Sequence, residues 1–335
     1  TFFLLCVSVL MVTRGALGPL AGVYTISFLL VMIFFAWFIL PFYIKSKIFT
    51  IPEFLEKRFS VASRYYFSAI TIVVNIFLDA AGSLYAAAMV MKIVFPEASL
   101  LTLSIVFAIV VAAYTIPGGL SAAIRVDLMQ GIFLLVGSIV LTFYATKNGG
   151  VEYVKELFAN GDTMMKLVRD NNDASVPWLG MLLGIPILGM FFWGNNQQLV
   201  QRVLTAKSID EGRKGVLLVG FLTMLTLFLI IIPGVMAIKL FPNLPKPDMV
   251  YPKLIMELLP NVLIGFMIAA MVAALTSSLS GLLNSVATLF TMDFYDKFYP
   301  ESSSKKKVRV GKIVSLTVLI IAVMWAPQIG KQFGT

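Results

Sequence analysis

The sequence contains no histidine and only one cysteine, and charged residues make up 13% of it. Without imidazole, the chain cannot form a histidine zinc site, a histidine proton relay or a Ser/His/Asp triad, which excludes most membrane hydrolases. The lone Cys6 allows no disulfide within the chain. The longest polar interval, about residues 147–175, is too short for a soluble domain, which needs about 50 residues or more.

Apolar residues, in contrast, make up 59% of the sequence, and the mean hydropathy is +0.93. These values predict an all-α polytopic membrane protein, because apolar runs of about 20 residues cross a bilayer as helices. Nine hydrophobic segments can be drawn, at 1–13, 19–43, 66–95, 98–116, 128–146, 177–199, 215–240, 261–291 and 309–327. The first is too short to span a bilayer, and we expect it to be part of an interrupted helix.

The net charge of +9 is carried largely by Lys and Arg in the intervals between segments. If segment 19–43 ends in the cytoplasm, most basic residues lie inside, as bilayer topology requires. The charge therefore indicates membrane orientation and not a nucleic-acid surface. The chain begins at Thr1 without an initiating Met or a signal-peptide pattern, and it ends soon after an apolar run, so we expect it to be a piece of a longer protein.

Segment 261–291 has no charge but is polar at its centre. At about 100° per residue, Ala274, Ser277, Ser278, Gly281 and Ser285 share one helix face. Hydroxyl and carbonyl oxygens at one level suit a hard cation such as sodium. The alternative is close packing against a neighbouring helix, for which small residues are also typical.

Segment 177–199 contains four glycines and Pro186, more breakers than a plain spanning helix needs. We expect this helix to be bent or locally unwound, since discontinuous helices mark the midplane sites of transporters. A simple proline kink is the alternative. The polar cluster at its inner end, residues 195–198, fits either a solute path or the membrane interface.

Two carboxylates lie in or beside spanning segments. Asp79 stands within segment 66–95, where a charge is costly unless it faces a cavity, a partner or an ion. We therefore expect it to be functional, and a protonated, hydrogen-bonded carboxyl is the structural alternative. Asp127 begins segment 128–146, where it could interact with the helix dipole, pair with Arg125 or bind a cation.

Four runs together resemble the sodium:solute symporter family, which includes bacterial sodium/galactose, proline and sialic-acid transporters. They are FTIPEFLEKRF (49–59), IPGGLSAAIRVDLMQ (116–130), FFWGNNQQLVQRVLTAKS (191–208) and ALTSSLSGLLNSVATLFTMDFYDKF (274–298). The resemblance implies a LeuT-like fold of five plus five core helices in inverted repeats. Residues 1–146 would form most of the first repeat and 177–327 most of the second, and the final core helix would be absent from this sequence.

The resemblance also implies ligands for the coupling ion. The family's sodium site falls on the carbonyl of Ala274 and the hydroxyls of Ser277 and Ser278, three residues of the polar helix face. A second sodium site in some relatives falls on Asp127 and Ser280, together with Ser277. Gly281 stands where those relatives have another serine, which argues against a second sodium here.

The implied solute pocket departs further from the galactose transporter. It falls on Tyr24, Thr25, Asp79, Gly189 and Thr223, and only the tyrosine is retained. Galactose is therefore not the expected solute, because a site built for fixed hydrogen bonds rejects ligands that cannot make them.

The aromatic pair Phe192 and Trp193 is the expected inner gate. We predict a plasma-membrane symporter, not an enzyme, in which sodium drives uptake of a small polar solute that is sugar-like, carboxylate-like or amino-acid-like. No cofactor and no nucleic acid is expected. A transporter-like sensor that binds a solute without net transport is the alternative. A channel is disfavoured because no acidic ring or carbonyl filter motif is present.

Overall fold

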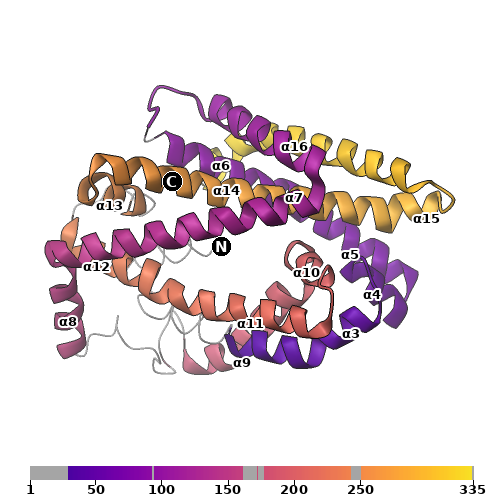
Figure 1. Cartoon of the computed structure of the whole chain (residues 1–335), viewed down its shortest axis with the longest axis horizontal. Coiled ribbons are helices and arrows are strands. Elements are labelled where there is room, and N and C mark those ends of the chain that lie inside the picture. The colour runs from indigo at the N-terminus through magenta and orange to yellow at the C-terminus, as the bar shows by residue number, and fades with distance from the viewer. Residues whose placement is uncertain (1–28, 93, 161–171, 173–176, 243–249, 334–335) are drawn as a thin grey trace. The chain divides into compact units, whose positions relative to one another are not determined.

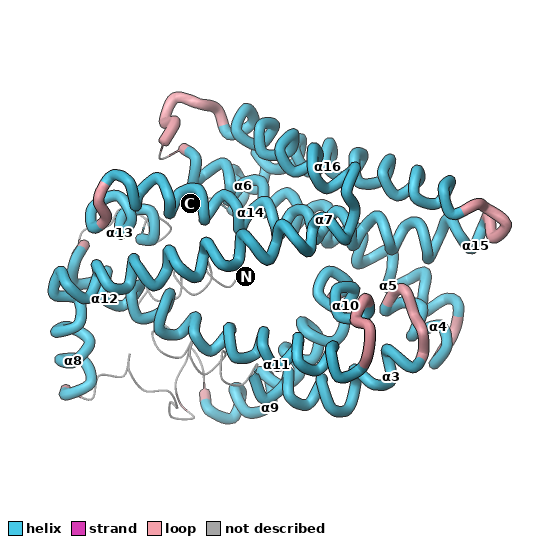
Figure 2. The backbone as a smooth tube through the Cα atoms, viewed as in Figure 1, coloured by secondary structure: helices cyan, strands magenta, loops and turns pink. Residues whose placement is uncertain are grey.

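The computed structural model describes residues 29–92, 94–160, 172, 177–242 and 250–333. Throughout these residues the chain forms helices joined by loops, with no strand (Figure 2). The helices before residue 161 are η1 (Phe35–Ile39), α3 (Leu40–Lys45), α4 (Ile51–Arg58), α5 (Val61–Val74), η2 (Asn75–Ala80), α6 (Ala81–Met91), α7 (Leu100–Ala145), η3 (Thr146–Gly150) and α8 (Val151–Ala159).

The remaining helices follow residue 177, and segments labelled η are π-helical turns that continue a neighbouring α-helix. They are α9 (Trp178–Met190), η5 (Phe191–Asn195), α10 (Gln197–Leu204), α11 (Ile209–Thr226), η6 (Leu227–Ile231), α12 (Ile232–Leu240), α13 (Val250–Leu258), α14 (Asn261–Leu289), η8 (Phe290–Tyr295), α15 (Asp296–Phe298) and α16 (Ser304–Phe333).

Six helices in the described part of the chain are long and apolar enough to cross a membrane. They are Val61–Lys92, Leu100–Ala159, Trp178–Asn195, Ile209–Leu240, Asn261–Phe298 and Ser304–Ile329. The predicted count of nine segments is not confirmed. Segment 1–13 lies outside the described residues, and the described part of 19–43 forms a shorter apolar helix, Leu29–Lys45.

The predicted segments 98–116 and 128–146 both lie within α7, which has a break between them. Gly119 has φ 61° and ψ −158°, a conformation open almost only to glycine. Pro117, just before it, removes one backbone donor and crowds the preceding turn. The sequence Pro-Gly-Gly therefore kinks the chain, and helical structure resumes before Arg125 and Asp127, so both residues belong to the helix.

Local sequence explains where α4 and α11 begin. The Thr50 hydroxyl accepts a hydrogen bond from the backbone N–H of Glu53 at the start of α4. The Ser208 hydroxyl likewise accepts from the Glu211 N–H at the start of α11. Both are Ser/Thr-x-x-Glu sequences, which satisfy free donors in the first helical turn.

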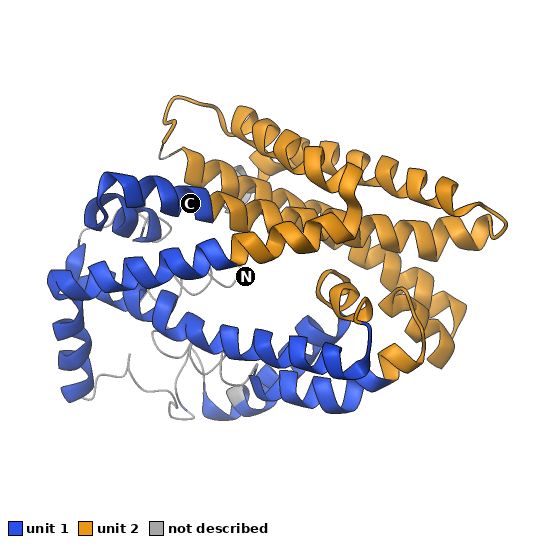
Figure 3. Cartoon of the chain, in the orientation of Figure 1, with its two compact units in different colours: residues 1–41, 132–195, 207–270 blue, residues 42–131, 196–206, 271–335 orange. Residues whose placement is uncertain are grey.

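The chain divides into two compact units (Figure 3): unit 1 comprises residues 1–41, 132–195 and 207–270, and unit 2 comprises residues 42–131, 196–206 and 271–335. Both units combine pieces from distant parts of the sequence. The proposed repeats, 1–146 and 177–327, stay a prediction, because a grouping by contact does not test internal symmetry.

Each unit has its own packing. In unit 1, α8 packs against η6, α12 and the end of α7, and the buried residues there are Ala145, Val154, Leu157, Ile231, Val235 and Met236. In unit 2, α16 lies along α6 and η2, and α4 packs against α5 (Figure 1). Phe77 and Trp325 meet edge to face in unit 2, with ring centroids 5.3 Å apart.

Candidate ion and solute sites

The polar face of α14 carries the predicted sodium ligands. Ala274, Ser277 and Ser278 are partly exposed, whereas Ser280 is fully buried. The Ser278 hydroxyl donates to the Ala274 carbonyl oxygen at 3.3 Å, so these two candidate ligands lie in contact. Three oxygen ligands thus lie within about one turn of a helix that is otherwise mostly apolar.

Asp127, on α7, contacts both this face of α14 and the helix α10, through residues that all belong to unit 2. The Ser277 hydroxyl donates to Oδ1 of Asp127 at 2.5 Å. Nη2 of Arg202 donates to Oδ2 of the same carboxylate at 2.6 Å. The Asp127 and Arg202 side chains are 16% and 28% exposed, so this ion pair is partly shielded from solvent.

Helix α10 lies directly against the polar face. Nε2 of Gln198 donates to the Ser278 carbonyl oxygen at 3.1 Å. Nε2 of Gln201 donates to the Gly281 carbonyl oxygen at 3.3 Å. Gly281 makes this approach possible, because a Cβ there would lie 2.7 Å from Nη2 of Arg202 and 2.9 Å from Nε2 of Gln198.

Ser280, the other predicted member of a second sodium site, has a different partner. Its hydroxyl oxygen accepts from Oγ1 of Thr115 at 2.8 Å. Nearby, the Tyr114 hydroxyl donates to the Thr276 carbonyl oxygen at 3.0 Å. Within the described residues, no hydrogen bond joins Ser280 to Asp127. A second sodium site on these two residues stays a prediction.

The predicted solute ligands are only partly placed. Tyr24 and Thr25 lie outside the described residues. Asp79 belongs to unit 2 and lies in η2 with its side chain exposed. Gly189 and Thr223 belong to unit 1: Gly189 is buried in α9, and the Thr223 hydroxyl donates to the Val219 carbonyl of its own helix at 2.8 Å. Of the predicted pocket residues that the structure describes, Asp79 thus belongs to one unit and Gly189 and Thr223 belong to the other.

The predicted gate residues lie where the backbone of segment 177–199 becomes irregular. Helix α9 continues through Pro186, so the expected unwinding is not found at that residue. The π turn η5 begins at Phe191, and Asn196 is extended before α10 begins. Phe192 and Trp193 lie in this turn, with their rings edge to face and their centroids 5.4 Å apart.

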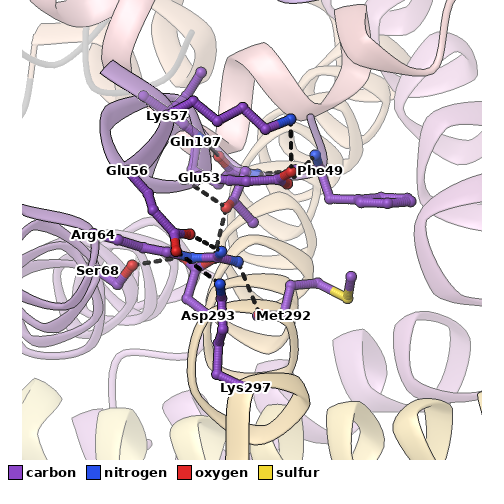
Figure 4. Close-up of polar contacts among 12 residues, drawn as sticks. Phe49, Glu53, Glu56, Lys57, Arg64, Ser68, Gln197, Met292, Asp293 and Lys297 are labelled. Carbon is purple, nitrogen blue, oxygen red and sulfur yellow. Dashed lines mark hydrogen bonds and ion pairs between the residues drawn. The ribbon is translucent and has the colours of Figure 1, made fainter. Parts of the chain in front are cut away.

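Sequence reasoning missed a buried ion-pair cluster in unit 2 (Figure 4). Asp293, which is fully buried, accepts hydrogen bonds from the hydroxyls of Thr50 at 2.7 Å and Ser68 at 2.6 Å, and from Nε of Arg64 at 2.9 Å. Nη2 of Arg64 also donates to the Met292 carbonyl oxygen at 2.9 Å. The cluster holds α4 and α5 to η8, the π turn that follows α14.

Glu56 completes this cluster on its more exposed side (Figure 4). Its carboxylate accepts from Lys297 at 2.8 Å and from Arg64 at 2.5 Å. Hydrogen bonds from these two groups hold the pKa of the Glu56 carboxyl below its usual value. The only sequence signal was the charges themselves, since Arg64 and Asp293 stand 229 residues apart.

Gln197 connects α10 to the start of α4. Its Oε1 accepts from the Ile51 backbone N–H at 2.9 Å, and its Nε2 donates to the Phe49 carbonyl oxygen at 3.2 Å. The predicted polar cluster at 195–198 thus includes a side chain with a structural role.

Comparison with known proteins places these observations in a family. A model of the sodium:solute symporter family matches residues 13–333. The sodium/mannose cotransporter SLC5A10 of Bos taurus is 32% identical over 91% of this chain and 56% of its own length. The sodium/glucose cotransporter 1 of Ovis aries is 30% identical over 94% and 53%, and the sodium/myo-inositol cotransporter 2 of Homo sapiens is 32% identical over 96% and 52%. The chain therefore spans about half the length of these relatives.

A solved structure shares the fold. It is described as the substrate-bound outward-open state of a Na+-coupled sialic acid symporter with a novel Na+ site. The superposition covers 98% of this chain and 74% of the symporter chain, with a TM-score of 0.82 at 23% sequence identity. The predicted family and the predicted all-α, LeuT-like fold class are confirmed by these matches. The chain belongs to the sodium:solute symporter family.

Proposed function

We propose that the whole protein is a secondary active transporter that uses the inward sodium gradient to take up a small, hydroxyl-rich solute across the plasma membrane. The family match supports sodium coupling. The curated relatives, which cotransport sodium with mannose, glucose or myo-inositol, support a polyhydroxylated solute. None of these relatives is named as a sensor or an enzyme, so the sensor alternative has no support from them.

The observation that carries the proposal is the group of oxygens on α14. The Ala274 carbonyl and the Ser277 and Ser278 hydroxyls lie within about one helical turn and remain partly exposed. Neutral oxygen ligands suit a hard monovalent cation that must bind and leave in each cycle. Sodium binding to one conformation better than to another is sufficient to couple its gradient to the solute.

For the solute, Asp79 is the most informative of the proposed ligands. Its exposed carboxylate within a spanning helix can accept hydrogen bonds from solute hydroxyls. Tyr24, Thr25, Gly189 and Thr223 complete the proposed set on the strength of the resemblance alone. Phe192 and Trp193 are proposed to close the inner side.

The test is uptake of labelled mannose, glucose and myo-inositol by the full-length protein in proteoliposomes, with an inward sodium gradient and a potassium control. We expect accumulation of at least one solute only with sodium. The double variant Ser277→Ala/Ser278→Ala should lose the sodium stimulation because it removes two of the proposed ligands.

Ser104→Ala is the matched control. Ser104 also lies in a spanning helix, and its hydroxyl donates to the carbonyl four residues earlier, as that of Ser278 does. The control should keep its sodium dependence. Undiminished sodium stimulation in the Ser277→Ala/Ser278→Ala protein would refute the assigned sodium site. Sodium-independent uptake by the unmodified protein would refute symport.

A further inference from the structure

The hydrogen bonds around α14 show where each hydroxyl proton goes. A serine hydroxyl has one proton and two lone pairs. The Ser277 proton goes to Oδ1 of Asp127, and the Ser278 proton goes to the Ala274 carbonyl. Because each proton is already donated to a protein acceptor, the lone pairs of both hydroxyls are free to face a cation.

We infer that Asp127 is a positioning residue for the proposed sodium site and not itself a sodium ligand. Its carboxylate accepts the Ser277 proton at 2.5 Å, which fixes the rotation of that hydroxyl. A charged acceptor also polarises the hydroxyl and so makes its oxygen a better ligand, as partners of ligating groups do at other metal sites. This inference rests on the proposed function, because it concerns the same ion.

Arg202 occupies the other oxygen of the same carboxylate. Its Nη2 lies 2.6 Å from Oδ2, so the charge of Asp127 is already balanced by a cation that belongs to the protein. A sodium ion bound to Asp127 would lie close to this guanidinium, and two like charges that close repel each other. Arg202 therefore holds Asp127 in place and excludes a second sodium from it.

The absence of a side chain at Gly281 permits this arrangement. A Cβ at that position would lie 2.7 Å from Nη2 of Arg202, too close for the guanidinium to stay where it is. Gln198 and Gln201 hold the same helix by donating to the carbonyls of Ser278 and Gly281. A side chain at position 281 would therefore shift the ends of the Arg202 and Gln198 side chains from their present positions.

The test is the sodium dependence of uptake by full-length Asp127→Asn/Arg202→Gln, in which both charges are removed so that neither is left unpaired. The unmodified protein should show a Hill coefficient for sodium near 1. The double variant should keep that coefficient but need roughly 10-fold more sodium for half-maximal uptake, the scale of loss seen when the partner of a metal ligand is removed. The sodium concentration for half-maximal uptake should rise, whereas the solute concentration for half-maximal uptake should stay unchanged.

Asp210→Asn/Arg213→Gln is the matched control, because it neutralises another Asp–Arg pair whose aspartate is 80% exposed. A Hill coefficient near 2 that drops to 1 in Asp127→Asn/Arg202→Gln would overturn the inference, since Asp127 would then bind sodium directly. An unchanged sodium requirement would overturn it as well.

Sodium-induced thermal stabilisation of the purified full-length protein, measured against choline, separates this inference from the proposed function. If no solute accumulates but sodium stabilises the unmodified protein, and the Asp127→Asn/Arg202→Gln protein needs more of it, the inference stands and symport of the tested solutes fails. If uptake depends on sodium equally in both proteins, symport stands and the inference fails. If sodium neither drives uptake nor stabilises the protein, both fail.

Discussion

Replacing the buried Asp293 by alanine should destabilise the protein far more than replacing an exposed carboxylate. The change leaves the Arg64 guanidinium, whose side chain is 6% exposed, without the fully buried carboxylate that it contacts. The hydroxyls of Thr50 and Ser68 lose their acceptor at the same time. Glu56 remains as one partner of Arg64, so the loss of charge pairing is incomplete.

The expected size follows from this environment. Removing one member of a buried ion pair costs about 3–5 kcal/mol, because the other charge stays buried and unpaired. Since Glu56 still contacts Arg64, we expect the lower end, about 3 kcal/mol. For Asp210→Ala, which removes an exposed carboxylate 3.4 Å from Arg213, we expect about 0–1 kcal/mol.

The assay is denaturant unfolding of both full-length variants in the same detergent, monitored by tryptophan fluorescence and compared with the unmodified protein. The Asp293→Ala protein should lose at least about 2 kcal/mol more than the Asp210→Ala protein, since a buried pair and an exposed pair differ by that much. Equal losses of stability would refute this prediction and would mean that burial does not decide how much these ion pairs contribute to the free energy of unfolding.

Three further changes can be measured by thermal unfolding. Gly119→Ala should lower the free energy of unfolding by about 1–3 kcal/mol because φ is 61° at that residue. Gly131→Ala is its control in α7, where an added Cβ meets no atom within 4 Å, and it should be neutral or stabilising. Equal shifts of the unfolding midpoint in the two variants would contradict the break at Gly119. Lys297 and Arg64 lower the pKa of Glu56, so its contribution to stability is complete above the unfolded pKa of 4.5 and is lost as the pH falls through the folded pKa. Glu56→Gln should remove that part of the loss of stability in acid. An unaltered dependence of the unfolding midpoint on pH would argue against this role of Glu56. Gly281→Ala should displace the ends of the Arg202 and Gln198 side chains at a cost of about 1 kcal/mol, the lower end for an added methyl group because these side chains are flexible, and an unchanged midpoint would show that both relax without loss.

The helices that can be predicted are those formed by one continuous apolar run of the sequence. Segment 261–291 is a long run without charge, and the structure forms a helix over Asn261–Leu289 in which the Ser278 and Gly281 carbonyls accept hydrogen bonds from α10. The interval between 116 and 128 belongs to no predicted segment, because Arg125 and Asp127 interrupt the apolar run. In the structure the chain is kinked at Gly119, and the helix that resumes after the kink includes Arg125 and Asp127. Asp127 is paired there with Arg202 from another helix.

The pairings cannot be predicted, because a sequence contains the charges but not their partners. By sequence, Arg202 is one more cytoplasmic basic residue, although it pairs with a carboxylate 75 residues earlier in the chain. Asp293 lies in the predicted run ALTSSLSGLLNSVATLFTMDFYDKF, but nothing near it in sequence indicates Arg64. By sequence, Gly281 is only a missing hydroxyl, whereas its structural consequence is the close approach of α10.

The π turns within the long helices have a consequence for how this chain tolerates changes in length. A π turn holds one residue more than an α turn, so each of them amounts to a one-residue insertion absorbed without breaking the helix. Removing Leu78 from η2 would convert the π turn into an α turn and leave the helix after it in nearly the same orientation. The faces of α6 that now lie buried, including Leu84 and Ala88, would keep their contacts. Single-residue deletions in these turns should therefore be far less damaging than deletions from a regular α turn, which rotate all following residues by about 100°.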